Sequence, residues 1–263
     1  MEVKALKFGG LTAKRPIVQG GMGVGVSLSS LAGNVAKCGG IGTISGVHPG
    51  YREADFKENP FRANLRAIGN ELEKAKEIAN GGIIGFNFMT VMNHYEEYVK
   101  EAIAAGADFI VSGAGLPVNL AKYAAGTRAA ILPIVSSARA LKLIVKQWQR
   151  ADRLPDAVVV EGPLAGGHLG YPYGHLVDGT FDTLEDSLVD VVDYVRELEE
   201  KNGVKIPVIA GGGVRNHADV ERLMALGASG VQVGTKFVAT EECDAAPAFK
   251  QAYLRSRKED VQL

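Results

Sequence analysis

Two stretches of this sequence decide its fold: EAIAAGADFIVSG (101–113) and RLMALGASGVQVG (222–234). Both contain the same unit, which is a helical pattern, a Gly-Ala turn and a short apolar run that ends in glycine. The apolar run is continuous rather than alternating, as is typical of a parallel strand covered on both faces. A repeated helix–turn–strand unit predicts an α/β fold.

Eight such apolar runs recur along the chain, with helical patterns between them. Strands are expected at 16–21, 40–45, 83–88, 109–114, 131–136, 157–162, 207–212 and 230–235. Helices are expected at 71–80, 94–107, 138–149 and 183–203. Eight strands alternating with helices over 263 residues predict a TIM (β/α)8 barrel in a single domain.

Two connections are longer than the others, residues 46–70 after the second strand and residues 163–182 after the sixth. Both follow the carboxyl end of a strand, and in a parallel barrel these ends form the catalytic face. We therefore expect a site at this end of the barrel.

The composition excludes several classes of protein. Hydrophobic residues make up 46% and charged residues 22%, with a net charge of −1, which argues against nucleic acid or a membrane as partner. No secretory signal or membrane-spanning run is present, so we expect a soluble cytoplasmic protein. The two cysteines, Cys38 and Cys243, are too few for a disulfide framework and are expected to be reduced packing residues. No metal site is predicted, because no H-x-x-x-H or C-x-x-C spacing occurs.

Two glycine clusters end the last two strands: AGGG (210–213), which contains Gly212 and Gly213, and QVGT (232–235). The second consists of Gln232, Val233, Gly234 and Thr235. Barrels often bind a phosphate between these two loops through backbone N–H groups, and Thr235 adds a hydroxyl. The alternative is that the glycines only form tight turns.

The first strand is followed by QGGMG (19–23). A dinucleotide-binding G-x-G-x-x-G is not formed, because Leu28 stands where the third glycine should be. We interpret this stretch as a glycine-lined wall for a flat ring, with Met22 as a soft contact.

Three polar side chains end other strands. His168 lies in AGGHLG (165–170) after the sixth strand, and imidazole suits proton transfer near neutral pH. Asn87 is a lone amide in an apolar strand, and its partner is either a bound heterocycle or a loop backbone. Glu161 is expected either at the polar part of a ligand or in a salt bridge. His175 is a weaker candidate for a substrate contact, and Ser112, Ser136 and Ser137 are weaker candidates for the same cavity.

The ordered motifs PIVQGGM, FNF, AGGHLG, GGG and QVGTKF resemble those of the nitronate monooxygenase family, which also contains FMN-dependent enoyl-acyl-carrier-protein reductases. The resemblance covers essentially the whole chain. It implies that His168 is the acid/base residue, and that FMN contacts the following residues: Met22, Asn87, Glu161, Gly166, Gly212, Gly213, Gln232, Val233, Gly234 and Thr235.

The sequence departs from the family pattern in three places. Many relatives have Gln at the position of Glu161 and an acidic residue at that of Leu164. They also usually continue past the eighth barrel unit, so residues 1–263 are expected to form an FMN-binding barrel domain without the family's C-terminal extension.

These features predict an FMN-dependent oxidoreductase with a small-molecule substrate, of which oxidation of alkyl nitronates with O2 is the leading reaction. The alternatives are an enoyl-acyl-carrier-protein reductase or a quinone reductase, each with NAD(P)H as co-substrate. From a different class, a flavin-free phosphate-binding lyase or isomerase is also compatible with the glycine clusters. A homodimer is one hypothesis for the assembly.

Overall fold

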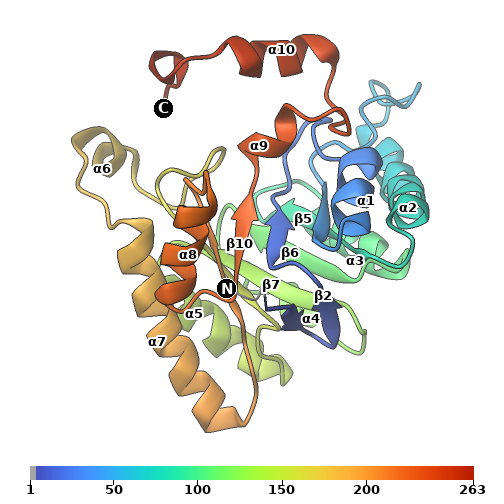
Figure 1. Cartoon of the computed structure of the whole chain (residues 1–263). Helices are drawn as coiled ribbons and strands as arrows, with labels where there is room; N and C mark the ends of the chain where they lie inside the picture. Colours follow the sequence, from blue (N-terminus) through green and yellow to red (C-terminus); the bar gives the residue numbers. More distant parts are fainter. Residues whose placement is uncertain (1–3) are drawn as a thin grey trace.

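A closed barrel of eight parallel strands forms the centre of the computed structural model, which describes residues 4–263 (Figure 1). Each strand pairs with the next along the chain, and the last pairs with the first. The barrel strands are β3 (Ile17–Gln19), β4 (Ile41–Ser45), β5 (Ile83–Met89), β6 (Phe109–Gly113), β7 (Ala130–Val135), β8 (Val158–Glu161), β9 (Val208–Gly211) and β10 (Gly230–Val233). All eight expected strands and the TIM barrel are confirmed.

Alternate residues of each strand pack on opposite sides of the barrel wall, because successive side chains of a strand point to opposite faces. Val18, Ile41, Ile83 and Val159 belong to the cluster inside the barrel. Their sequence neighbours, such as Ile84 and Val160, belong to the larger cluster between barrel and helices. This alternation fixes which polar residues point toward the barrel axis.

A hairpin that the sequence analysis did not predict closes the amino-terminal end of the barrel. It consists of β1 (Leu6–Phe8) and β2 (Leu11–Ala13), which pair antiparallel. Leu6, Phe8 and Ala13 join the interior cluster, and the ring of Phe8 meets that of Phe109 edge-on at 6.0 Å. The amino-terminal end of the barrel is therefore filled by side chains, which leaves the carboxyl end of the strands for a ligand.

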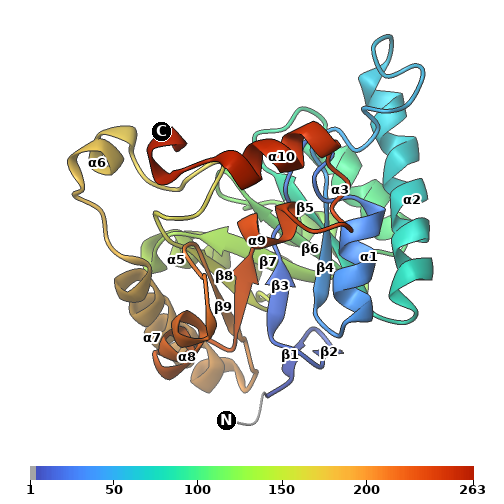
Figure 2. The same ribbon diagram turned by 45° about the horizontal axis from the view of Figure 1, so that its top comes forward.

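Helices surround the barrel between the strands (Figures 1 and 2). They are α1 (Ser29–Lys37), α2 (Pro60–Ala79), α3 (Tyr95–Ala104), α4 (Leu120–Tyr123), α5 (Ala138–Trp148), α6 (Tyr173–Asp178), α7 (Leu184–Asn202), α8 (His217–Ala225), α9 (Thr235–Val238) and α10 (Pro247–Arg255), with 3-10 turns η1 (Gln149–Ala151) and η2 (Lys258–Asp260). Nothing among them is long and apolar enough to cross a bilayer, within the part of the chain that the structure describes.

The structure corrects the start of one expected helix. α2 begins at Pro60 rather than at residue 71, so the first half of the helix occupies part of the predicted loop 46–70. Asn59 caps it by accepting a hydrogen bond from the backbone N–H of Arg62 at 3.1 Å, and Pro60 provides a preset first helical residue. The loop after β4 is correspondingly shorter than expected.

The carboxyl end of the barrel carries most of the additional structure. The connection after β8 includes the short helix α6, and α10 lies across this end of the molecule, opposite the N-terminal hairpin (Figures 1 and 2). Both cysteines were predicted to be packing residues. Cys243 is buried as expected, but the prediction is wrong for Cys38, which is exposed at the end of α1.

Candidate active site

Three polar side chains converge on the barrel axis at the carboxyl end of the strands. Asn87 has the same inward parity on β5 as the interior residue Ile83, and Glu161 has that of Val159 on β8. Gln232 lies on β10 and pairs in register with Gly211, which in turn pairs with Glu161. The strands thus bring together three of the residues predicted from sequence.

Glu161 and Gln232 contact each other directly. The Nε2 amide group of Gln232 donates a hydrogen bond to Oε1 of Glu161 at 3.0 Å, across the side chain-free Gly211. No salt bridge to Glu161 occurs within the described residues, so the salt-bridge alternative is not the one that the fold uses. Burial raises the pKa of the Glu161 carboxyl to about 7, against a smaller lowering by Gln232.

Gly20 and Gly21 lie between two amide side chains. A Cβ on Gly21 would lie 2.4 Å from the Cβ of Asn87, and a Cβ on Gly20 would lie 3.5 Å from Cγ of Gln232. Only glycine at position 21 allows the backbone to approach Asn87 this closely. Met22 continues this wall, with its Sδ 3.4 Å from the place where Gly234 would carry a Cβ.

The two predicted phosphate loops are adjacent and rich in free donors. Gly212 and Gly213 have φ values of +103° and +78°, which favour glycine. The N–H groups of Gly212, Gly213, Gly234 and Thr235 donate to no acceptor within residues 4–263. Unpaired backbone donors are uncommon unless water or a ligand reaches them. These loops therefore fit a phosphate group, as the sequence predicts.

His168 lies on the loop after β8, at the same end of the barrel. Its side chain is exposed and forms no hydrogen bond within the described chain. The loop is fixed just beyond it, where Oγ of Ser136 donates to the carbonyl oxygen of Gly170 at 2.9 Å and the hydroxyl of Tyr171 donates to that of Glu161 at 3.3 Å. The structure places His168 at the carboxyl end of the barrel strands, without contact to the inward-facing trio.

The remaining predicted residues differ in their positions. Val233 uses its carbonyl oxygen to accept the N–H of Gly20 at 2.9 Å, which joins β10 to the glycine wall. A Cβ on Gly166 would meet no atom within 4 Å, so this residue borders open space. His175 is exposed on α6.

Of the weaker serine candidates, only Ser136 faces the mouth. The prediction for Ser112 is wrong, because its side chain lies on the outer side of the barrel. There its hydroxyl donates to the carbonyl oxygen of Phe88 and accepts a hydrogen bond from the Tyr95 hydroxyl. Ser137 caps the start of α5, where its Oγ accepts the N–H of Ala140 at 3.3 Å.

One inward-facing residue was missed by the sequence analysis. Ser45 ends β4 and pairs in register with Asn87, with the same parity as the interior residue Ile41. Its Oγ lies 2.9 Å from the place where Gly23 would carry a Cβ. The signal that could have found it is a hydroxyl at the last inward position of an apolar strand.

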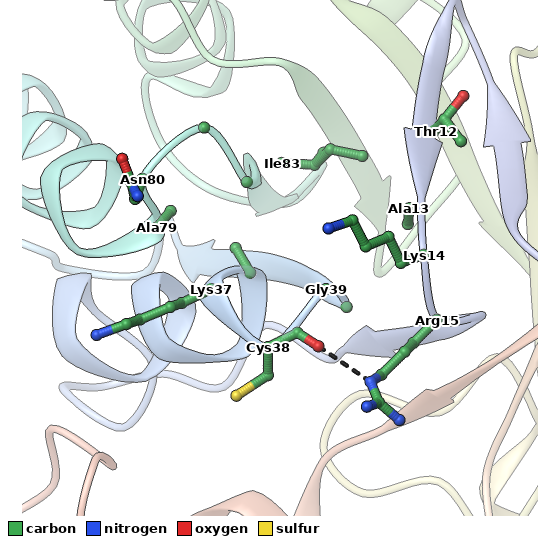
Figure 3. A pocket seen from close by; sticks show the side chains of 14 residues that line it. Thr12, Ala13, Lys14, Arg15, Lys37, Cys38, Gly39, Ala79, Asn80 and Ile83 are labelled. Carbon is green, nitrogen blue, oxygen red and sulfur yellow. Dashed lines mark hydrogen bonds between the residues drawn. The ribbon is translucent and has the colours of Figure 1, made fainter.

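A hollow of about 500 Å³ lies at the opposite, amino-terminal end of the strands (Figure 3). Lys14, Arg15 and Lys37 line it together with the carboxyl ends of α1 and α2. Nε of Arg15 donates to the carbonyl oxygen of Cys38 at 3.0 Å. Cations are favourable beside the exposed carbonyl groups of a helix end, which accounts for their presence here. The candidate site is therefore the carboxyl end, with its convergent polar groups.

Comparison with known proteins agrees with this geometry. The family model described as "Nitronate monooxygenase" matches residues 4–263. A probable nitronate monooxygenase of Staphylococcus saprophyticus is 25% identical over 99% of this chain and 75% of that protein. A hydroxy-methyl-oxo-octahydroindene-carboxyl-CoA dehydrogenase of Rhodococcus jostii is also 25% identical, over 94% of this chain and 59% of that protein.

Among solved structures, that of FabK from Thermotoga maritima is similar, with a TM-score of 0.71 and 25% identity. The match covers 93% of this chain and 65% of that one. The chain therefore spans between about three fifths and three quarters of the length of these proteins. This chain is thus equally similar, at 25% identity, to proteins with different names.

Proposed function

This chain belongs to the nitronate monooxygenase family, a family of oxidoreductases, and on that premise we propose that it is an FMN-dependent enzyme that oxidises alkyl nitronates with O2. The observation that carries the proposal is the combination of a glycine wall, an inward polar trio and two loops of free backbone donors at one end of the barrel.

The residues present fit FMN in three separate regions. A flat ring would lie against Gly20, Gly21 and Met22, where the wall carries almost no side chains. The polar edge of the ring has donors and acceptors, which the inward-facing side chains Asn87, Glu161 and Gln232 would satisfy. The phosphate would accept hydrogen bonds from the free N–H groups of the two glycine loops, with Gly166, Val233 and Thr235 completing the surroundings. FMN would supply the redox chemistry.

His168 is assigned the proton transfer. Its exposed imidazole is positioned on the catalytic face by a loop anchored at Gly170 and Tyr171. As a neutral imidazole, it would accept a proton from the carbon beside a nitro group. As a protonated imidazolium, it would instead hold a nitronate anion. Because His168 does not contact the trio, the loop would have to close toward it, and Gly167, with a φ of +86°, is a flexible position for that movement.

The proposal is tested in two steps. An absorbance spectrum of the purified protein should show flavin bands, and denaturation should release FMN. Oxygen uptake should then follow the addition of an alkyl nitronate. A protein that stays colourless after FMN is added would refute the cofactor assignment and favour the flavin-free lyase or isomerase.

The second candidate is an enoyl-acyl-carrier-protein reductase, which the similarity to FabK favours. It would transfer hydride from NAD(P)H to an enoyl thioester, with His168 as proton donor to the α-carbon. Oxidation of NADH or NADPH that requires an enoyl thioester, without oxygen uptake on a nitronate, would select this reaction. Reduction of a quinone by NAD(P)H would select the third alternative.

A further inference from the structure

Glu161 is a carboxyl group without a cation. It lies at the carboxyl end of β8 and faces the barrel axis. The only side-chain hydrogen bond it forms within the described residues is the one from Gln232 at 3.0 Å. An ionised carboxylate that is mostly withdrawn from water requires a cation or several donors, and here a single neutral amide donates to Oε1 alone. The arrangement is poor for a carboxylate and suitable for a neutral carboxylic acid.

The groups around Glu161 leave its charge uncompensated. β9 presents Gly211 and β10 presents Gln232, neither of which titrates. The loop after β8 presents the Tyr171 hydroxyl, which donates to the backbone carbonyl oxygen of Glu161, not to its carboxyl group. The start of α7 presents Leu184, which packs against Gly162. Burial raises the pKa of Glu161 to about 7, and no charged group contributes to the shift.

We propose, resting on the function proposed above, that Glu161 keeps its proton when the cofactor ring is bound and donates it in a hydrogen bond to an acceptor on the ring. A glutamine at this position would be a neutral donor of similar size. A protonated Glu161 is also a neutral hydrogen-bond donor, but it loses its proton as the pH rises.

The proposal makes cofactor binding pH-dependent, with a definite sign. Below about pH 7 the carboxyl group is already protonated in the free protein, so binding takes up no proton. Above about pH 7 the free protein has lost the proton, and a ring that covers the mouth removes the remaining water and makes ionisation still less favourable. Binding must then recover one proton, so the Kd for FMN should rise by up to about tenfold for each pH unit.

The experiment is an equilibrium titration of the FMN-free protein with FMN from pH 6 to pH 9, followed by quenching of flavin fluorescence. Wild-type protein should bind FMN with a constant Kd up to about pH 7 and a rising Kd above it. Glu161→Gln should bind FMN at every pH without this rise, because its donor does not titrate. Glu200→Gln, which removes an exposed carboxyl group from the far end of α7, should keep the wild-type profile.

A second readout needs no cofactor. At pH 6 the infrared carbonyl band of a protonated carboxylic acid should be weaker in FMN-free Glu161→Gln than in the FMN-free wild type, because ordinary Asp and Glu side chains are ionised at about this pH. The proposal is overturned if Glu161→Gln keeps the wild-type rise in Kd, or if the wild-type Kd does not change between pH 7 and pH 9. If the wild-type protein binds FMN at no pH, the proposed function is overturned instead. Both outcomes above require that the wild-type protein binds FMN, so the two failures can be told apart.

Discussion

The position of His168 allows its role to be separated from that of the cofactor site. The imidazole is exposed and contacts none of the inward-facing side chains, so its removal should not disturb them. We expect His168→Ala to lower kcat by about 10²- to 10⁴-fold, the usual contribution of a general acid or base, with an unchanged Kd for FMN.

The matched control is His175→Ala, on the same connection and also exposed. It should keep near wild-type turnover. Rates for both variants, measured by oxygen uptake with a saturating nitronate, decide the assignment. Equal rates for His168→Ala and the wild type would remove His168 from the proton-transfer role.

Gly21 should be more sensitive to substitution than any other residue of the glycine wall. A Cβ there would lie 2.4 Å from the Cβ of Asn87, so Gly21→Ala must move either the backbone or the amide. We expect a loss of about 1–3 kcal/mol in the free energy of unfolding, the usual effect of overpacking, together with weaker FMN binding. Urea unfolding and fluorescence titration measure the two effects.

Gly166→Ala is the comparison for that variant, because its added methyl group would meet no protein atom within 4 Å. Its stability should stay within about 0.5 kcal/mol of the wild type. Weaker FMN binding at unchanged stability would support contact between Gly166 and the cofactor. A large loss of stability in Gly166→Ala would contradict the open surroundings that the structure shows.

The residues of the candidate site were predictable to different degrees. Asn87, Glu161 and Gln232 are polar residues at the ends of apolar strands, so their inward direction follows from the alternation of a strand. Ser112 has the same kind of position in the sequence but points outward, because one residue of phase decides the face. The close approach of Gly21 to Asn87 depends on how two strands meet, which no local pattern records.

At the scale of elements, the N-terminus of α1 depends on a residue more than 200 positions away in the sequence. Asp244, in the segment between α9 and α10, accepts hydrogen bonds from the backbone N–H groups of Leu28, Ser30 and Leu31 at 2.9, 3.2 and 3.1 Å. These are among the N–H groups that lack a partner at any helix start. The contact fixes the segment before α10 to the first helix of the barrel.

We expect Asp244→Ala to destabilise the protein by about 1–2 kcal/mol, the usual cost of losing a helix cap. Hydrogen exchange should become faster in two places, the first turn of α1 and residues 239–246, because each holds the other. Glu242→Ala, which alters an exposed neighbour, should change neither. Faster exchange in α1 alone would mean that the segment is held by other contacts.

The elements themselves were predictable wherever they were long. Each barrel strand is an apolar run followed by glycine or a polar residue, and such a run has few other interpretations. The hairpin β1–β2 was missed, because three-residue strands are too short to show a periodicity. The early start of α2 was missed although Asn59 and Pro60 mark it, because the long spacing between the second and third strands was assigned to a loop over 46–70.

At the scale of the whole molecule, the charges are distributed unevenly. The connections 20–28, 90–94 and 114–119, and the first part of the connection after β8 (162–172), contain no Lys, Arg, Asp or Glu, although charged residues make up 22% of the chain. Several large apolar side chains are exposed there instead: Val24, Val91, Leu116 and Leu164. Scattered apolar side chains are normal on a surface, but a group of them around a candidate site favours an apolar ligand.

This distribution predicts how the enzyme should rank its substrates. Among linear alkyl nitronates from two to six carbons, kcat/KM should rise with chain length, by up to about fourfold per methylene, because each buried CH2 contributes about 0.8 kcal/mol. A nitronate that carries a second negative charge at its far end should be a much poorer substrate, because the uncharged connections offer that charge no partner. Oxygen uptake across the series measures both effects. A flat dependence on chain length, or a preference for the doubly charged compound, would mean that the substrate approaches by the charged loop after β4 or along α10, and not across the apolar connections.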